Sequence, residues 1–129
     1  MGKPEKEIQD ACMDYLDRHP FVAWVHVTTT GNIPRRGGKW IKVGYPGMGD
    51  IIGQLKNGRL LSVETKQPGQ KPTVIQTDFM NHVNYHGGLA LWCDSLDSLI
   101  EQFEGLGFPI ILRELKEESI TGQSGDGKD

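Results

Sequence analysis

The sequence predicts an α/β domain with a mixed central β-sheet and helices on both faces of that sheet. Three observations predict this class. Apolar residues near the N-terminus recur at helical spacing, and two short apolar runs further on flank the hairpin signal Asn57-Gly58. A helical pattern then separates this hairpin from another apolar strand. The expected element order is α-β-(β)-β-β-α-β-α, in which the brackets mark a short strand.

Length and composition indicate one domain without a membrane span or a signal peptide. A chain of 129 residues supports one domain, which we place at residues 1–115, and the polar, glycine-rich residues 116–129 are expected to form a flexible tail. No apolar run approaches the ~20 residues of a membrane span, and the N-terminus lacks the apolar core of a signal peptide. Cys12 and Cys93 lie outside any ligand-spaced pattern and indicate reduced thiols in a cytoplasmic protein.

The first part of the chain predicts a helix followed by strands. Residues 4–18 carry a helical stripe made of Ile8, Ala11, Cys12, Tyr15 and Leu16. Residues 21–29 are β-rich and suit a central strand. Residues 31–38 are expected to form a flexible loop, and residues 39–43 the short bracketed strand.

The register of the central hairpin decides which side chains meet. A two-residue turn at Asn57-Gly58 would set Asp50 opposite Thr65. A three-residue loop, with Gly58 at the positive φ of a bulge, sets Asp50 opposite Glu64 instead.

The second register is expected, because it sends the apolar side chains of both strands to the core together. These side chains are Ile51, Leu61 and Val63. Lys66 then shares a strand face with Asp50 and Glu64. Directly opposed residues have β-carbons about 5 Å apart. This spacing suits two carboxylates that hold one hard cation, since two like charges would otherwise repel.

A helix is expected after the hairpin, with Thr73 as its N-cap and its end at about Tyr85. The expected packing side consists of Val74, Ile75, Phe79, Met80 and Val83. Asp78, His82 and His86 are spaced by four residues. They form either a solvated face or a stripe that binds a transition metal, and the solvated face is expected because no third fixed protein ligand accompanies the histidines.

The last elements are a buried strand at residues 89–93 and a helix that ends at about Glu104. Its apolar stripe consists of Leu96, Leu99, Ile100 and Phe103. Residues 108–112 form either an edge strand or an arm that docks on a partner subunit.

The net charge of −3 hides a basic middle segment. Residues 35–71 hold eight basic side chains and only two acids, Asp50 and Glu64, while both flanking segments are net acidic. The candidate nucleic-acid contacts in and around this loop-rich window are Arg35, Arg36, Lys39, Lys42 and Lys71. A basic segment whose acids are the proposed metal ligands suits a phosphate-cleaving site. The plainer alternative is a solvated basic loop.

The arrangement Asp50…Glu64-Thr65-Lys66 resembles the signature of the PD-(D/E)xK nuclease superfamily. The wider context resembles its VRR-NUC family, and most of all the small stand-alone members carried by phages, over about residues 5–97. The matching segments are Glu7-Ile8-Gln9, Gly47-Met48-Gly49-Asp50-Ile51-Ile52, Val63-Glu64-Thr65-Lys66 and Gln76. The chain departs from the family at Gly49, where proline is usual.

The resemblance implies a restriction-endonuclease-like fold and a metal-dependent DNA endonuclease, selective for branched, flap or junction DNA. It implies a homodimer in the cytoplasm of a bacterial host. The implied catalytic residues are Asp50, Glu64, Lys66 and Gln76, and the implied ligands of Mg²⁺ or Mn²⁺ are Glu7, Asp50, Glu64 and the carbonyl of Thr65. The alternative is a non-catalytic nucleic-acid-binding module that retains the nuclease fold, in which Glu64 and Lys66 form only a structural salt bridge.

Overall fold

The computed structural model describes residues 3–28 and 31–106, and for Lys3 and residues 31–35 and 39–43 it describes the backbone alone. The helices are α1 (Lys3–Arg18), α2 (Val74–Tyr85) and α3 (Leu96–Gly105). The strands are β1 (Val22–Val27), β2 (Gly31–Arg35), β3 (Lys39–Val43), β4 (Ile51–Leu55), β5 (Leu60–Thr65) and β6 (Leu89–Cys93). The expectations for residues 108–112 and 116–129 concern segments outside the described residues. None of the described helices is both long enough and apolar enough to cross a membrane.

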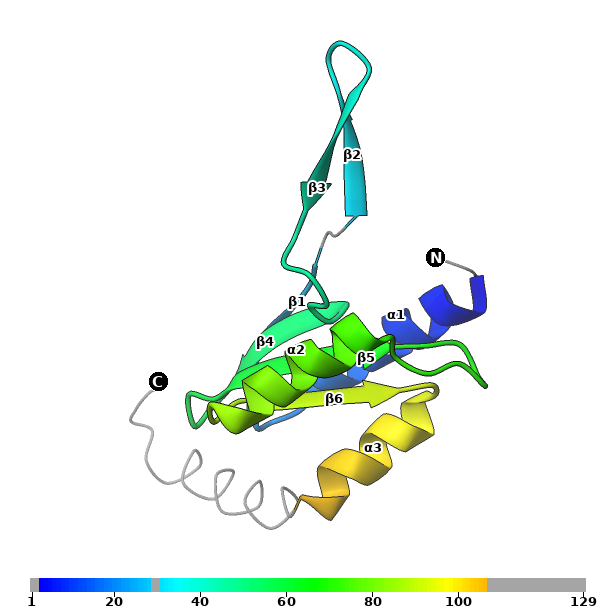
Figure 1. The fold of residues 1–129 in the computed structure, drawn as a ribbon. Helices are drawn as coiled ribbons and strands as arrows, with labels where there is room; N and C mark the ends of the chain where they lie inside the picture. Colours follow the sequence, from blue (N-terminus) through cyan, green and yellow to red (C-terminus); the bar gives the residue numbers. More distant parts are fainter. Residues whose placement is uncertain (1–2, 29–30, 107–129) are drawn as a thin grey trace.

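The central sheet has the strand order β1-β4-β5-β6. Strand β4 pairs antiparallel with β1 and with β5, whereas β5 and β6 are parallel because α2 carries the chain back between them (Figure 1). The prediction of an α/β fold with a mixed sheet is therefore confirmed.

The sheet is covered on both faces. One face packs against α1 and α3 in the main core, which includes Leu16 of α1, Ile51, Leu61 and Val63 of the sheet, and Phe103 of α3. The other face packs against α2 through a smaller cluster that consists of Phe79, Met80, Val83 and Ala90, with Met48 and Trp92 at its margin. Alternation along the strands explains this division, because neighbouring residues point to opposite faces.

The β4–β5 hairpin has the register that the apolar pattern predicts. Ile51 pairs with Val63 and Gly53 with Leu61. The Leu55 amide donates to the Arg59 carbonyl at 2.9 Å, which closes a three-residue loop, and Gly58 in that loop has φ 93°.

The segment expected as a flexible loop is the first strand of a second hairpin. Strands β2 and β3 pair antiparallel from Gly31 with Val43 to Arg35 with Lys39, and the hairpin extends away from the central sheet (Figure 1). The turn between them uses Gly37 and Gly38 at positive φ. The loop assignment was wrong because Pro34 argues against a central strand, whereas a two-stranded ribbon accepts proline at its free edge.

Strand β1 lies at the edge of the sheet, although its apolar run suggested a central position. Strand β5 pairs with the other side of β4, so within residues 3–28 and 31–106 β1 pairs with β4 alone. Most of its side chains are exposed or half-buried, including Trp24 at 47%. Strand propensity reports a pleated, partly buried surface and does not distinguish an edge from a centre.

Helix α2 begins as predicted, with Thr73 as its N-cap. The Thr73 hydroxyl accepts from the Gln76 amide, and the Gln76 side chain accepts in turn from the Thr73 amide, which is a capping box. The predicted packing side was wrong in the first turn, because Val74 and Ile75 are 77% and 60% exposed. This turn faces Glu64 through Gln76, and the apolar contacts begin only at Phe79.

The two cysteines, far apart in the sequence, meet in the main core. The Sγ atoms of Cys12 in α1 and Cys93 in β6 lie 3.6 Å apart, and both thiols are free. Both side chains are fully or almost fully buried.

We expect both thiols to be protected from a bulky aromatic disulfide reagent in the native protein, because the reagent reaches them only after unfolding. In denaturant, two thiols per chain should react. A Cys12→Ala variant serves as the control and should yield one thiol. Rapid labelling of the native protein, or no labelling after unfolding, would contradict the arrangement.

Candidate active site

Glu64 lies near the end of β5 and is the most unusual carboxyl group of the described residues. It is 3% exposed, and its Oε1 atom is buried without a hydrogen-bond partner. The pKa of Glu64 is raised to about 8. Burial contributes most to this rise, the negative charges of Asp50 and Glu5 add to it, and Lys66 acts in the opposite direction. Glu64 therefore retains its proton at neutral pH unless a positive charge compensates it.

Asp50 stands directly before β4, where the hairpin register continued by one residue places it opposite Glu64. Its Oδ2 atom accepts from the Thr65 amide at 3.0 Å and from the Thr65 hydroxyl at 2.7 Å. The Thr28 amide donates to the Asp50 carbonyl at 2.9 Å, and the Thr28 hydroxyl donates to the Gly49 carbonyl at 2.8 Å. Both the backbone and the carboxylate of Asp50 are thus held. Sequence patterns did not single out Thr28, because its contact joins β1 to a distant segment.

Lys66 and Gln76 converge on the same oxygen of Glu64. The Lys66 Nζ atom lies 3.6 Å from Glu64 Oε2, and its side chain is 13% exposed. The Gln76 Nε2 atom donates to Glu64 Oε2 at 2.9 Å, while its Oε1 atom accepts from the Thr73 amide at 2.8 Å. The cap of α2 therefore fixes the amide that contacts Glu64. Both donors leave the other oxygen of Glu64 without a partner.

Gly49 allows Asp50 to reach this position. A Cβ atom at Gly49 would lie 2.6 Å from Ser62 Oγ and 2.8 Å from the Val63 carbonyl oxygen. Contacts that short require the hairpin to shift, so glycine lets the chain before β4 approach β5 closely. The difference from the usual proline of the resembled family therefore has a steric reason in this chain.

The acidic residue of α1 that acts on Glu64 is Glu5. Glu5 is half-buried and its charge raises the pKa of Glu64, whereas the Glu7 side chain is exposed. At 100° per residue, Glu5 lies on the helix side of the buried Gln9 and Cys12, and Glu7 points almost oppositely. This helical phase can be read from the sequence, and it places Glu5 on the buried side of the helix. The prediction of Glu7 followed the resemblance instead.

The carboxylates of Asp50 and Glu64 suit a hard cation that retains several water ligands. Asp50 and Glu64 offer two opposed carboxylates, and the unpartnered Oε1 atom of Glu64 needs a positive partner. Within residues 3–28 and 31–106, no group of three or more His, Cys, Asp or Glu side chains is arranged to hold a metal ion. Magnesium is commonly bound by one or two carboxylates and several waters, so two carboxylates are sufficient.

The predicted nucleic-acid contacts are partly described. Arg36 is exposed in the turn of the β2–β3 hairpin, and Lys71 is exposed before α2. The side chains of Arg35, Lys39 and Lys42 lie outside the described atoms. The helical stripe is solvated as expected: Asp78, His82 and His86 are all exposed.

We expect the stability of the protein in chelator to fall as the pH rises from about 4.5 to about 8, through the contribution of Glu64. In this interval the folded state binds a proton that the unfolded state releases, so rising pH favours unfolding. A Glu64→Gln variant should lose this contribution and become more stable than the wild type above pH 8. The difference should reach a few kcal/mol at most, since one pKa unit is worth about 1.4 kcal/mol.

Urea unfolding at several pH values measures this difference. The control is Glu101→Gln, which alters an exposed carboxyl group of α3 and should follow the wild-type profile. Parallel pH profiles for the wild type and Glu64→Gln would show that Glu64 titrates normally.

We compared the chain with known protein families, curated proteins and solved structures. No family model, no curated protein and no solved structure matches the chain significantly. The likeness to the VRR-NUC family therefore depends on the residues named above.

Proposed function

We propose that this protein is a metal-dependent nuclease that hydrolyses phosphodiester bonds, with a restriction-endonuclease-like fold. One observation carries the proposal: the hairpin register opposes Asp50 to the buried Glu64 and places Lys66 within 3.6 Å of it. A buried carboxylate held beside a second carboxylate is destabilising by itself. A site that binds a divalent cation and a phosphate gives this arrangement a function.

Asp50 and Glu64 would hold Mg²⁺ or Mn²⁺, with the Thr65 carbonyl as a further ligand by the resemblance. A bound cation of this kind supplies charge neutralisation at the phosphate and makes a neighbouring water more acidic. Asp50 is oriented for ligation by Thr65, which bonds one carboxylate oxygen from its amide and its hydroxyl. On the opposite strand, Glu64 keeps its Oε1 atom free of protein hydrogen bonds.

Lys66 and Gln76 complete the site on the side of Glu64. The ammonium group of Lys66 stabilises the charge that develops on the phosphate or orients the attacking water. Gln76 holds the carboxyl group of Glu64 through its 2.9 Å bond and is itself fixed by the Thr73 cap. Glu5, the nearby acid of α1, is the further side chain available to a second cation.

The basic window supports nucleic acid as the substrate. Arg36 and Lys71 present exposed positive charge on the projecting hairpin and on the segment before α2. Such side chains contact phosphates without regard to sequence. Preference for branched DNA, action as a homodimer and a cytoplasmic location are proposed from the resemblance alone.

Incubation with supercoiled, nicked and branched DNA, with Mg²⁺ or with chelator, tests the function. We expect strand cleavage that requires the metal. DNA binding without cleavage of any substrate would instead identify a non-catalytic nucleic-acid-binding module.

We expect Lys66→Ala to abolish cleavage, with a loss of at least about 100-fold, while folding and DNA binding stay largely intact. The reason is that the ammonium group acts on the charge that develops during hydrolysis. Single-turnover cleavage and anisotropy binding on the same DNA separate the two effects. Lys56→Ala, in the hairpin turn at the other end of β5, is the matched control and should cleave normally. Undiminished cutting by Lys66→Ala would remove this residue from the mechanism.

We expect Asp50→Asn to weaken Mn²⁺ binding by about tenfold or more, because it removes one of two ligand charges. Calorimetric titration of the protein without DNA measures this affinity directly. Asp97→Asn, in the first turn of α3, provides the control. An unchanged affinity in Asp50→Asn would place the metal elsewhere.

A further inference from the structure

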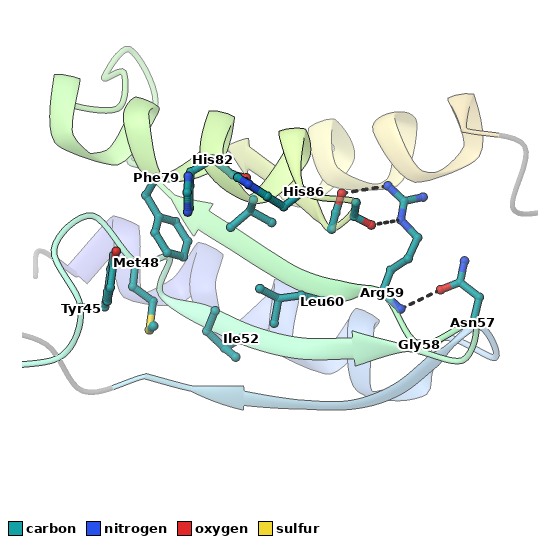
Figure 2. Close-up of a pocket in the computed structure, with 13 residues that line it drawn as sticks. Tyr45, Met48, Ile52, Asn57, Gly58, Arg59, Leu60, Phe79, His82 and His86 are labelled. Carbon is teal, nitrogen blue, oxygen red and sulfur yellow. Dashed lines mark hydrogen bonds between the residues drawn. The ribbon is translucent and has the colours of Figure 1, made fainter.

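A groove opens on the same sheet face as the candidate site, beside α2. Helix α2 packs on β5 and β6, and among the described helices none packs on the neighbouring part of β4 on this face. The groove has a volume of about 680 Å³, and Figure 2 shows it between α2, the start of β5 and the segment before β4. Its walls include Tyr45, Ile52, Leu60, Phe79 and His82.

The groove has an apolar floor and an exposed aromatic side wall. Ile52 and Leu60 form the floor, and Leu60 remains 42% exposed (Figure 2). Tyr45 is 58% exposed, and its ring lies against Phe79 with a centroid distance of 5.7 Å. A flat aromatic ligand can therefore lie over apolar side chains with an aromatic ring at its side.

The rim of the groove is basic. Among the described residues that line it, the ionisable groups other than Tyr45 are Arg59, His82 and His86, and no carboxylate is present. Two bonds hold the Arg59 guanidinium at the rim, since its Nε and Nη2 atoms donate to the Gly87 and Gly88 carbonyls at 2.8 and 2.9 Å. An adjacent hollow, which shares Tyr45 and His82 with the groove, has the acid Asp78 in its lining. The rim therefore favours an anionic ligand.

Helix α2 borders both the groove and the candidate site. Gln76 contacts Glu64 from the first turn of this helix, whereas His82 and His86 lie six and ten residues further on. At 1.5 Å per residue this separation is about 9 to 15 Å. Stacked nucleotides rise about 3.4 Å each along a strand, so the groove lies about three to four nucleotides from the site.

We propose that this groove holds an unpaired nucleobase of the strand whose phosphate occupies the Asp50–Glu64 site. The inference depends on the nuclease function proposed above and adds a subsite that binds a base. The base places its π-face against Tyr45 and the apolar floor, and its polar edge faces the histidines. A base inside a duplex is stacked and paired on all sides and cannot enter. The groove therefore selects single strands, flaps and splayed arms over continuous duplex.

Binding in chelator tests the inference without any cleavage. The probes are a fluorescein-labelled single strand, a splayed fork and a blunt duplex that share one sequence, measured by anisotropy. We expect the single strand and the fork to bind more tightly than the duplex. Tyr45→Ala should weaken binding of the single strand by about tenfold, which matches the loss of one stacking contact, and should leave the duplex nearly unchanged.

Two further variants control for the aromatic ring. Tyr45→Phe retains the ring and should keep the preference. Tyr85→Ala removes a side chain that is 86% exposed on α2 and does not line the groove, so it should behave as the wild type. In addition, 2-aminopurine moved along the strand should be quenched at one position in the wild type and not in Tyr45→Ala.

The outcomes separate the groove from the nuclease function. Equal binding of all three probes, or an unchanged preference in Tyr45→Ala, would overturn the groove inference even if metal-dependent cleavage is found. A preference that depends on Tyr45 in a protein that cleaves nothing would support the groove and overturn the nuclease proposal. Occupation of the groove by an apolar segment such as residues 108–112 would appear as no Tyr45-dependent binding, and would likewise overturn it.

Discussion

The three-residue loop at the end of the β4–β5 hairpin is the constraint on which the rest of the structure depends. Gly58 adopts a positive φ there, and the loop sets the pairing of every residue in the two strands. A slip of one residue would exchange the faces of one strand. Ile51 and Val63 would then no longer pair in the main core, and Asp50 would no longer face Glu64. The same register therefore determines both the core and the candidate site.

The candidate site contains an unfavourable electrostatic interaction between the carboxyl groups of Glu64 and Asp50. Glu64 is buried beside Asp50, and the nearby charge of Lys66 compensates only in part, so the pKa of Glu64 remains raised to about 8. The hydrogen bonds from Gln76 and Thr65 hold the two carboxyl groups where they are. Either a proton or a cation can relieve the repulsion. In the nuclease that we propose, this cost in stability provides affinity for a divalent ion, as strained sites elsewhere serve function.

Helix α2 borders both the candidate site and the groove. In its first turn the apolar side chains of Val74 and Ile75 are exposed. The same turn directs the Gln76 side chain to Glu64. Its later turns pack on the sheet through Phe79 and Val83, which also form one wall of the groove. Helices α1 and α3 pack on the other face in the main core. In the nuclease that we propose, the strand of nucleic acid would lie on the part of the sheet face beside α2.

The sequence by itself determined the features that depend on near neighbours. The hairpin register follows from the positions of Asn57-Gly58 and the apolar alternation, and the start of α2 follows from the Thr73 cap. The same register and the alternation of side chains predicted that one face of the hairpin groups Asp50, Glu64 and Lys66. These predictions succeeded because turns, caps and alternation act over a few residues.

Only the tertiary structure decided which distant segments meet. The edge position of β1, the contact of Cys12 with Cys93 and the bond from Thr28 to the segment before β4 join parts of the chain that no local pattern relates. The physical reason is that burial and long-range pairing are properties of the packed chain, whereas propensity and spacing describe one segment at a time.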